Sequence, residues 1–192
     1  MKLLSWNVRG LGKPRTVGRL NQKLREENPS IFFLVETKLS AARMEKVRKK
    51  CGFPNGIDVD AVGRRGGLSL GWKSSCVVSL RSYSDRHIDI IIEDDSEGLQ
   101  WRCTGFYGAP EVHRRQEAWD LLRSLDNCPE IPWLVIGDFN EILLSSEKRG
   151  VCYAAKDKWI FSGRCWTIVL WTILGSSANG LRGRKGNERF QT

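Results

Sequence analysis

The sequence has no closely spaced cysteines, and this excludes the familiar zinc-binding patterns. Its six cysteines lie far apart in 192 residues, with no Cys-x-x-Cys pair, whereas structural zinc sites need such pairs. Their density is also too low for a small secreted domain held together by disulfides. We therefore expect free thiols in an intracellular protein. The cysteines are Cys51, Cys76, Cys103, Cys128, Cys152 and Cys165.

Long apolar runs and histidines are scarce as well. Residues 1–8 form too short an apolar run for a signal peptide and lack a cleavage site. The apolar segment 159–174 is shorter than the roughly 20 residues of a membrane-spanning helix, and Arg164 interrupts it. We therefore expect no membrane partner. The only histidines are His87 and His113.

The net charge is positive but unevenly distributed. A formal charge of +9 usually suggests a nucleic-acid partner. Residues 151–192 hold seven Lys/Arg against two Asp/Glu, whereas residues 1–150 hold 24 against 20. More than half of the surplus therefore belongs to the last stretch of the chain, so the charge alone does not identify a function.

The apolar pattern indicates an α/β layered domain. Short apolar runs bounded by turn residues alternate with segments whose apolar residues recur at helical spacing. We see no internal repeat, and the short spacing of the middle strands suggests antiparallel hairpins. Ser40 is the expected cap of the second helix. The expected strands are 1–8, 30–35, 68–72, 76–80, 87–92, 99–107 and 132–136, and the expected helices are 14–27, 40–50 and 111–125.

Three of the expected strands end in polar residues that their apolar bodies do not explain. These are Asn7, Glu36 and the pair Asp138/Asn140. Ligands of α/β sheets bind beyond the carboxyl ends of strands, and a carboxylate there can hold Mg²⁺. Each residue alone also fits a turn or a solvated position. Their combination, with a buried strand before each, favours a metal-dependent site.

Four segments resemble the successive motifs of the endonuclease/exonuclease/phosphatase superfamily. They are SWNVRGLG, FLVETKL, GFYGAP and IGDFNEIL. The most similar branch is the apurinic-endonuclease-like domain of plant non-LTR retrotransposons of the long-interspersed-element kind, which GRRGGLSLGWK and NEILLSSEKRG also resemble. The resemblance covers residues 1–150. It implies the N-terminal part of a four-layer α/β/β/α sandwich of the deoxyribonuclease I-like type.

The resemblance also implies a role for each site residue. Glu36 would be the direct ligand of Mg²⁺, with Mn²⁺ as a substitute, and Asn7 would support the metal and the scissile phosphate. Tyr107 would contact the phosphate, Asp138 would orient or deprotonate the attacking water, and Asn140 would hold a phosphate oxygen. The implied reaction is hydrolytic nicking of DNA that leaves a 3′-hydroxyl, which implies a nuclear location for a retrotransposon protein.

The family pattern continues beyond the last segment that resembles it, with a further Asp strand and a Ser-Asp-His motif. Neither His87 nor His113 matches that histidine, and we expect surface or structural roles for both. We therefore expect an incomplete domain over residues 1–150 with little activity. Its first sheet would expose apolar surface, because later residues of the family supply much of the second sheet.

Residues 151–192 do not resemble the family and show no clean amphipathic pattern. Codons consistent with this tail, read in a shifted frame, can give a sequence similar to the family after EKRG. Our hypothesis is a reading-frame change near Gly150–Val151. Sequencing the gene tests it, since a codon series without such an alternative reading contradicts it.

Alternatives to a nicking endonuclease remain open. The chain could be a non-catalytic remnant that binds nucleic acid through Lys/Arg and phosphate contacts. It could also be a functionless pseudogene product that folds poorly. Within the superfamily, phosphoinositide phosphatase or sphingomyelinase chemistry is a further alternative. Nicking, salt-dependent DNA binding and cooperative melting separate these hypotheses.

Overall fold

The computed structural model describes residues 1–94, 99–126, 131–140 and 169–170, which form two sheets and their covering helices. The first half of the chain contains β1 Leu3–Asn7, α1 Pro14–Glu27, β2 Ile31–Val35, α2 Ala41–Lys50, β3 Asn55–Val62 and β4 Arg65–Trp72. The remainder contains β5 Val77–Tyr83, β6 His87–Asp94, β7 Leu99–Tyr107, η1 Val112–Arg114, α3 Arg115–Ser124, β8 Trp133–Asp138 and β9 Val169–Leu170.

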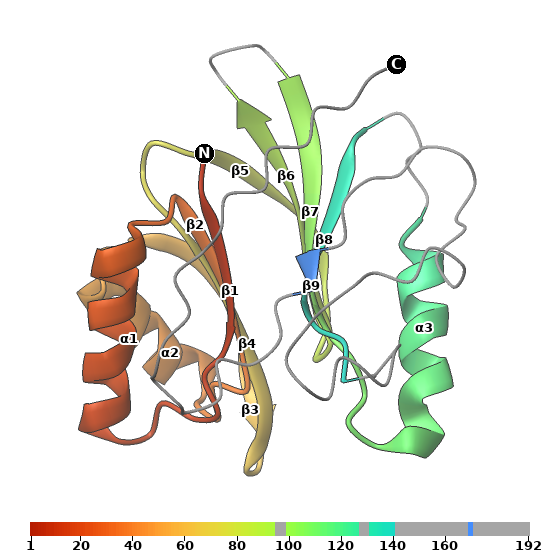
Figure 1. Ribbon diagram of the computed structural model, residues 1–192, viewed down its shortest axis with the longest axis horizontal. Helices are drawn as coiled ribbons and strands as arrows, with labels where there is room; N and C mark the ends of the chain where they lie inside the picture. Colours follow the sequence, from red (N-terminus) through yellow and green to blue (C-terminus); the bar gives the residue numbers. More distant parts are fainter. Residues whose placement is uncertain (95–98, 127–130, 141–168, 171–192) are drawn as a thin grey trace, which may run out of the picture.

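The two sheets pack face to face between helical layers (Figure 1). The first has the strand order β1-β2-β4-β3, and the second has the order β5-β6-β7-β8-β9. Helices α1 and α2 cover the outer face of the first sheet, and α3 covers that of the second. This is the expected α/β/β/α sandwich. No helix among the described residues is long and apolar enough to cross a membrane.

Each sheet contains a parallel pair of strands joined through a helix, and β9 is also parallel to β8. Strands β1 and β2 are parallel with α1 between them, and β7 and β8 are parallel with η1 and α3 between them. Strands β5, β6 and β7 are antiparallel neighbours, as the short spacing predicted. A parallel pair places the carboxyl ends of its strands at the same edge of the sheet. We call the edge where β1, β2, β7 and β8 end the carboxyl rim.

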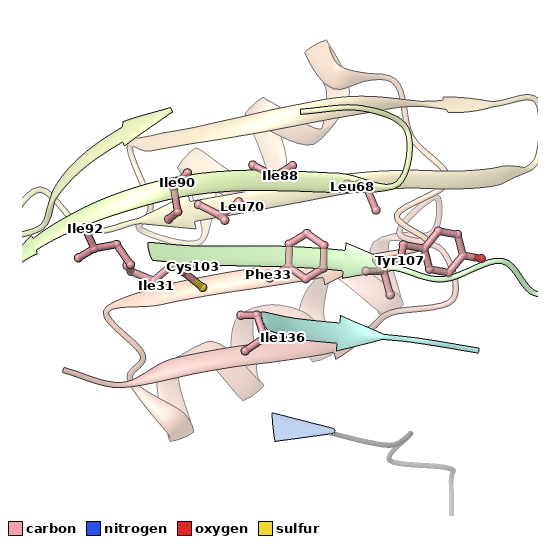
Figure 2. Packing of buried hydrophobic residues seen from close by; sticks show 11 residues of the cluster. Ile31, Phe33, Leu68, Leu70, Ile88, Ile90, Ile92, Cys103, Tyr107 and Ile136 are labelled. Atoms are coloured by element: carbon pink, nitrogen blue, oxygen red, sulfur yellow. The ribbon is translucent and has the colours of Figure 1, made fainter. Parts of the chain in front are cut away.

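The core lies mainly between the sheets (Figure 2). All five residues of β2 are buried, as its continuous apolar run predicted. Side chains of β2 alternate, so that Phe33 faces the second sheet while Phe32 packs under the helices. A Cβ on Gly105 of β7 would overlap the Phe33 ring, so the absence of a side chain there lets the sheets approach closely.

The expectation that the first sheet would expose its inner face is wrong. Strands β5 to β8, all within residues 77–138, form a second sheet across it. Ile88 and Ile90 of β6 and Ile136 of β8 are buried against the side chains of the first sheet. The second sheet therefore obtains its inner apolar face from the part of the chain that precedes residue 150.

Two local predictions also needed correction. Strand β3 was not predicted, because its residues are mostly half-buried and include Asp58 and Asp60. Ser40 precedes α2 but makes no side-chain capping bond. Instead, Asp60 Oδ1 accepts a hydrogen bond of 2.7 Å from the backbone N–H of Ala41. A residue 19 positions further along the chain thus satisfies the helix terminus.

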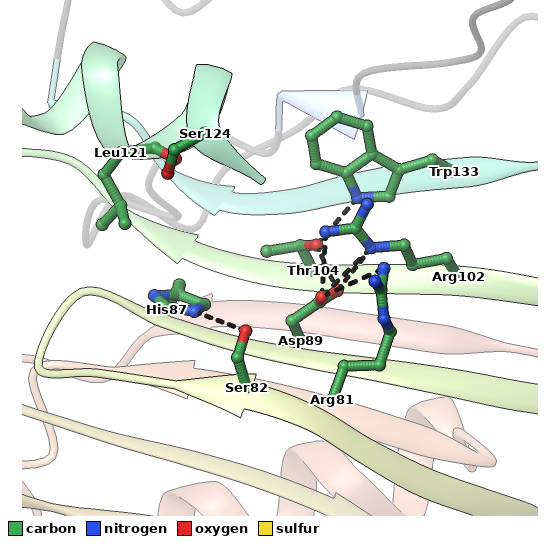
Figure 3. A network of polar contacts seen from close by, with 9 residues as sticks. All are labelled: Arg81, Ser82, His87, Asp89, Arg102, Thr104, Leu121, Ser124 and Trp133. Carbon is green, nitrogen blue, oxygen red and sulfur yellow. Dashed lines mark hydrogen bonds and ion pairs between the residues drawn. The ribbon is translucent and has the colours of Figure 1, made fainter. Parts of the chain in front are cut away.

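A buried ionic network lies on the outer face of the second sheet (Figure 3). The Arg102 guanidinium donates to both oxygens of Asp89, at 2.9 and 3.1 Å, and stacks 4.4 Å from the Trp133 ring centroid. Thr104 donates to Asp89 and accepts from the Trp133 indole N–H. These contacts link β6, β7 and β8. They pair the buried Asp89 carboxylate with the Arg102 guanidinium, since an unpaired charge at this depth would be costly.

Candidate active site

The carboxyl rim brings together side chains from both sheets. The Asn7 amide nitrogen donates to Glu36 Oε1 at 3.0 Å and to Asp138 Oδ2 at 2.8 Å. Asn7 ends β1 and Glu36 directly follows β2 of the first sheet, whereas Asp138 ends β8 of the second. One amide nitrogen therefore bridges two carboxylates that lie 102 positions apart in the sequence. We call Glu36 and Asp138 the carboxylate pair.

Glu36 has three polar partners. Besides Asn7, the Tyr107 hydroxyl donates to Oε1 at 3.2 Å, and the Lys38 ammonium lies 3.5 Å from Oε2. The Glu36 side chain is 21% exposed, so it remains accessible from the rim. Burial raises the pKa of Tyr107, and the charge and the hydrogen bond of Glu36 raise it further. The phenol therefore stays protonated and acts as a donor near neutral pH.

Asn140 fixes the segment that follows β8. Its side-chain amide donates to the carbonyl oxygen of Gly108 at 2.9 Å, and its backbone N–H donates to Asp138 Oδ1 at 3.1 Å. Asn140 therefore ties the end of β8 to the end of β7 and orients the Asp138 carboxylate. The second oxygen of that carboxylate is the one that accepts from Asn7.

The rim also concentrates unusual backbone conformations. Among the described non-glycine residues, five have a left-handed φ, and four of these five lie at the rim. Such conformations persist only where surrounding contacts hold them, and they cluster at functional sites. Here Thr37 and Lys38 donate backbone hydrogen bonds to the Gly67 and Gly66 carbonyls of β4. The four residues are Arg9 (50°), Glu36 (55°), Lys38 (54°) and Asn140 (52°).

A groove of about 560 Å³ opens beside the carboxylate pair. Glu36 and Tyr107 line one part of it, and the turns between β3 and β4 and between β5 and β6 line much of the rest. We call it the basic groove, because five cationic side chains line it. These are Lys38, Arg64, Arg65, Arg86 and Arg114.

The donor set at the rim fits a hard divalent cation. Among the described residues no group of three or more His, Cys, Asp or Glu side chains is placed to hold a metal ion. Mg²⁺, however, is commonly held by only one or two carboxylates together with water and substrate phosphates. Glu36 and Asp138 supply such carboxylates. They lie close together, because both accept a hydrogen bond from the amide nitrogen of Asn7. Asn7 Oδ1 accepts from the Arg9 backbone N–H, so Asn7 presents its nitrogen to the pair.

The structure thus assembles all five residues that the sequence singled out: Asn7, Glu36, Tyr107, Asp138 and Asn140. Their individual catalytic roles stay predictions. Lys38 was not predicted, although it follows Glu36 by two positions within FLVETKL. Arg64 and Arg86 were not predicted either, because nothing in a local sequence pattern places two separate turns beside one groove.

Neither histidine belongs to this site. His87 is buried on β6, where its ring nitrogens lie 3.0 Å from Ser82 Oγ and 2.8 Å from Ser84 Oγ. This agrees with the structural role expected for it. His113 lies in η1, and neither ring lines the basic groove. Cys51, Cys76 and Cys103 are free thiols, as expected, and burial raises the pKa of Cys103 to about 12.

A two-sheet sandwich with a carboxylate pair at its rim defines the class of protein. A family model described as "Endonuclease/Exonuclease/phosphatase family" matches residues 4–184, so the chain belongs to that family. The match continues past residue 150, where the sequence motifs suggested a boundary, and that boundary stays a prediction. No curated protein matches the chain.

Several solved structures share the fold at low sequence identity. The human Nocturnin catalytic domain is 18% identical with a TM-score of 0.56, and the match covers 74% of this chain and 64% of that one. The Xenopus laevis APE2 catalytic domain is 18% identical with a TM-score of 0.51, and the match covers 73% of this chain and 59% of that one. D. rerio TDP2 in complex with single-strand DNA product is 15% identical with a TM-score of 0.53, and the match covers 78% of this chain and 64% of that one. The chain thus spans less than two thirds of these structures.

Proposed function

We propose that this site hydrolyses phosphodiester bonds of nucleic acid with Mg²⁺, or Mn²⁺, as its cofactor. The observation that carries the proposal is the convergence of Glu36 and Asp138, from different sheets, on one amide nitrogen of Asn7. Membership of the endonuclease/exonuclease/phosphatase family supports phosphodiester chemistry. Nucleic acid is favoured because fold relatives include AP endonucleases and a TDP2 bound to single-strand DNA.

The residues divide the work between holding the cation and handling the phosphate. Glu36 would hold the divalent ion, and Asn7 supports that position through its bonds to both carboxylates. The ion, when bound, neutralises charge on the phosphoryl oxygens. The Asn140 amide has a second proton besides the one donated to Gly108 and can donate it to a phosphate oxygen. The protonated Tyr107 hydroxyl would donate to a phosphate oxygen in place of its bond to Glu36.

Asp138 is the proposed base. It accepts a proton from water as the water oxygen bonds to phosphorus, and the bond from phosphorus to the leaving sugar oxygen breaks. The leaving oxygen takes a proton from solvent. The backbone N–H of Asn140 fixes one oxygen of Asp138, so the carboxylate is already oriented before substrate binds.

The retrotransposon branch is the finer form of the proposal. The forms WNVRGLG and GDFNEIL favour it, and it implies nicking of DNA with a 3′-hydroxyl that a polymerase can extend. We also propose that this chain is slow. His87 and His113 are the only histidines in the sequence, and in the described structure neither lines the groove or bonds to the carboxylate pair. Loss of a general catalytic group commonly costs roughly 10²–10⁴-fold in rate.

The proposal is tested by metal binding and nicking together. Mn²⁺ binding, followed by electron paramagnetic resonance, is expected in the wild-type chain and is expected to be lost in Glu36→Gln. Slow Mg²⁺-dependent nicking of supercoiled plasmid should disappear with the same substitution and in EDTA. Arg19→Ala on the exposed face of α1 is the matched control and should change neither result. Nicking or Mn²⁺ binding that survives Glu36→Gln contradicts the assignment.

A non-catalytic nucleic-acid-binding remnant is the second candidate. It is favoured by the cationic side chains that line the groove together with the absence of both histidines from that lining. DNA binding and Mn²⁺ binding without any nicking would support this candidate over the enzyme.

A further inference from the structure

The basic groove is lined by two turns that face the carboxylate pair from different sheets. Arg64 lies in the turn between β3 and β4, and Arg86 lies in the turn between β5 and β6. The Tyr107 backbone N–H donates to the Arg86 carbonyl at 2.7 Å, so the second turn is anchored next to the site. Both arginines therefore project from positions fixed relative to Glu36.

The cations of the groove differ in whether they have partners. Lys38 pairs with Glu36, Arg65 with Glu111, and Arg114 with Glu117. The side chains of Arg64 and Arg86 have no ion-pair or hydrogen-bond partner among the residues that the structure describes. Two guanidinium groups thus line a groove beside the catalytic carboxylates with their donors available to a ligand.

The acidic residues of the groove are mostly engaged. Glu36 has the partners described above, Asp60 accepts from the N-terminus of α2, and Glu111 pairs with Arg65. The exception is Asp85, which lies beside Arg86 in the same turn and is exposed. Asp85 is therefore a lining carboxylate expected to repel an anionic ligand, and removal of its charge should strengthen binding where removal of an arginine weakens it.

We propose that the basic groove binds the sugar–phosphate backbone of a single nucleic-acid strand, with Arg64 and Arg86 each contacting a phosphate that flanks the one at the carboxylate pair. The inference rests on the proposed function, since the ligand is the polymer that the site would cleave. Guanidinium groups match phosphate geometry through paired donors. A groove volume of about 560 Å³ has room for a segment of one strand.

The proposed contacts are to phosphate and not to bases. Of the described residues that line the groove, only Tyr107 is aromatic, and it is buried and bonded to Glu36. Base stacking needs exposed aromatic faces, so we expect weak sequence preference. The affinity is instead expected to depend steeply on salt, because each phosphate contact releases a counterion.

The test measures binding of a labelled single-stranded DNA of about 12 nucleotides by fluorescence anisotropy in EDTA. The salt series runs between about 50 and 200 mM. Arg64→Ala and Arg86→Ala are each expected to weaken binding and to reduce the slope of log affinity against log salt by about 0.7. Asp85→Asn should tighten binding. Arg19→Ala and Asp126→Asn are matched controls, which alter the same charges at exposed positions away from the groove.

The proposal is overturned if Arg64→Ala and Arg86→Ala show the same slope of log affinity against log salt as the control Arg19→Ala. It is also overturned if inositol hexakisphosphate binds with dependence on both arginines while the oligonucleotide does not, since the groove then takes a small phosphate ester. Binding in EDTA requires no metal, so it is measured separately from the proposed hydrolysis. If Mn²⁺ binding or nicking fails while the two arginine variants still reduce the salt slope, the proposed hydrolysis is wrong and the proposed binding of a strand in the groove stands.

Discussion

Tyr107 joins the chemistry of the site to the stability of the fold. Its ring is buried between the sheets, while its hydroxyl reaches the rim and donates to Glu36. Burial and the neighbouring carboxylates Glu36 and Asp138 all disfavour the phenolate, so the pKa lies well above the ordinary tyrosine value. Up to about pH 9 the phenol is protonated in the folded and the unfolded chain alike, and it contributes no pH dependence.

Above that pH the unfolded chain loses the proton while the folded chain retains it, so stability falls as the pH rises. We predict that Tyr107→Phe reduces the loss of unfolding free energy between about pH 9 and pH 11. Urea unfolding at both pH values measures the loss. Tyr83→Phe is the control, since Tyr83 is 59% exposed and lies outside the core. Equal losses in Tyr107→Phe and the wild-type chain would refute the link.

At the scale of elements, glycines make room for the phenylalanine rings of β2. Gly105 of β7 faces Phe33 between the two sheets, whereas Gly71 of β4 pairs with Phe32 within the first sheet, on its helix-covered face. The apolar run of β2 and the positions of these glycines are visible in the sequence. The contacts between these glycines and the phenylalanine rings are not visible in the sequence, because they depend on the register of strands that are distant along the chain.

We predict that Gly105→Ala destabilises the protein by about 1–3 kcal/mol, because the added methyl group overlaps the Phe33 ring. Gly18→Ala provides the contrast. Gly18 lies in α1 with open space where the methyl group of an alanine would lie, so alanine there should stabilise by about 0.5–1 kcal/mol. Chemical denaturation measures both changes. A neutral Gly105→Ala would mean that the sheets are not in such close contact.

At the scale of the whole molecule, residues up to Asp138 supply the inner faces of both sheets. The local elements of this part were largely predictable: α1 has the expected bounds, and β1, β2, β6, β7 and β8 overlap the expected strands. It was not predictable that residues 77–138 form the second sheet against the first, because local periodicity does not determine which strands pair or which sheets pack together.

We predict that a chain ending at residue 150 keeps a cooperative unfolding transition, because the described buried cluster between the sheets is formed by residues that precede residue 150. Urea unfolding followed by tryptophan fluorescence and by circular dichroism should give coincident curves. This outcome would support the predicted boundary at residue 150. Loss of the transition would mean that residues 151–192 are an integral part of the fold and would contradict the boundary.

The sequence by itself determined which segments are strands and helices and which polar residues stand at strand ends, because side-chain periodicity and turn residues act locally. Only the tertiary structure decided that Glu36 and Asp138 share one amide donor, that Asp60 caps α2, and that Arg64 and Arg86 line one groove. These are contacts between segments distant in the chain. They arise from sheet packing and strand register, which no local pattern records.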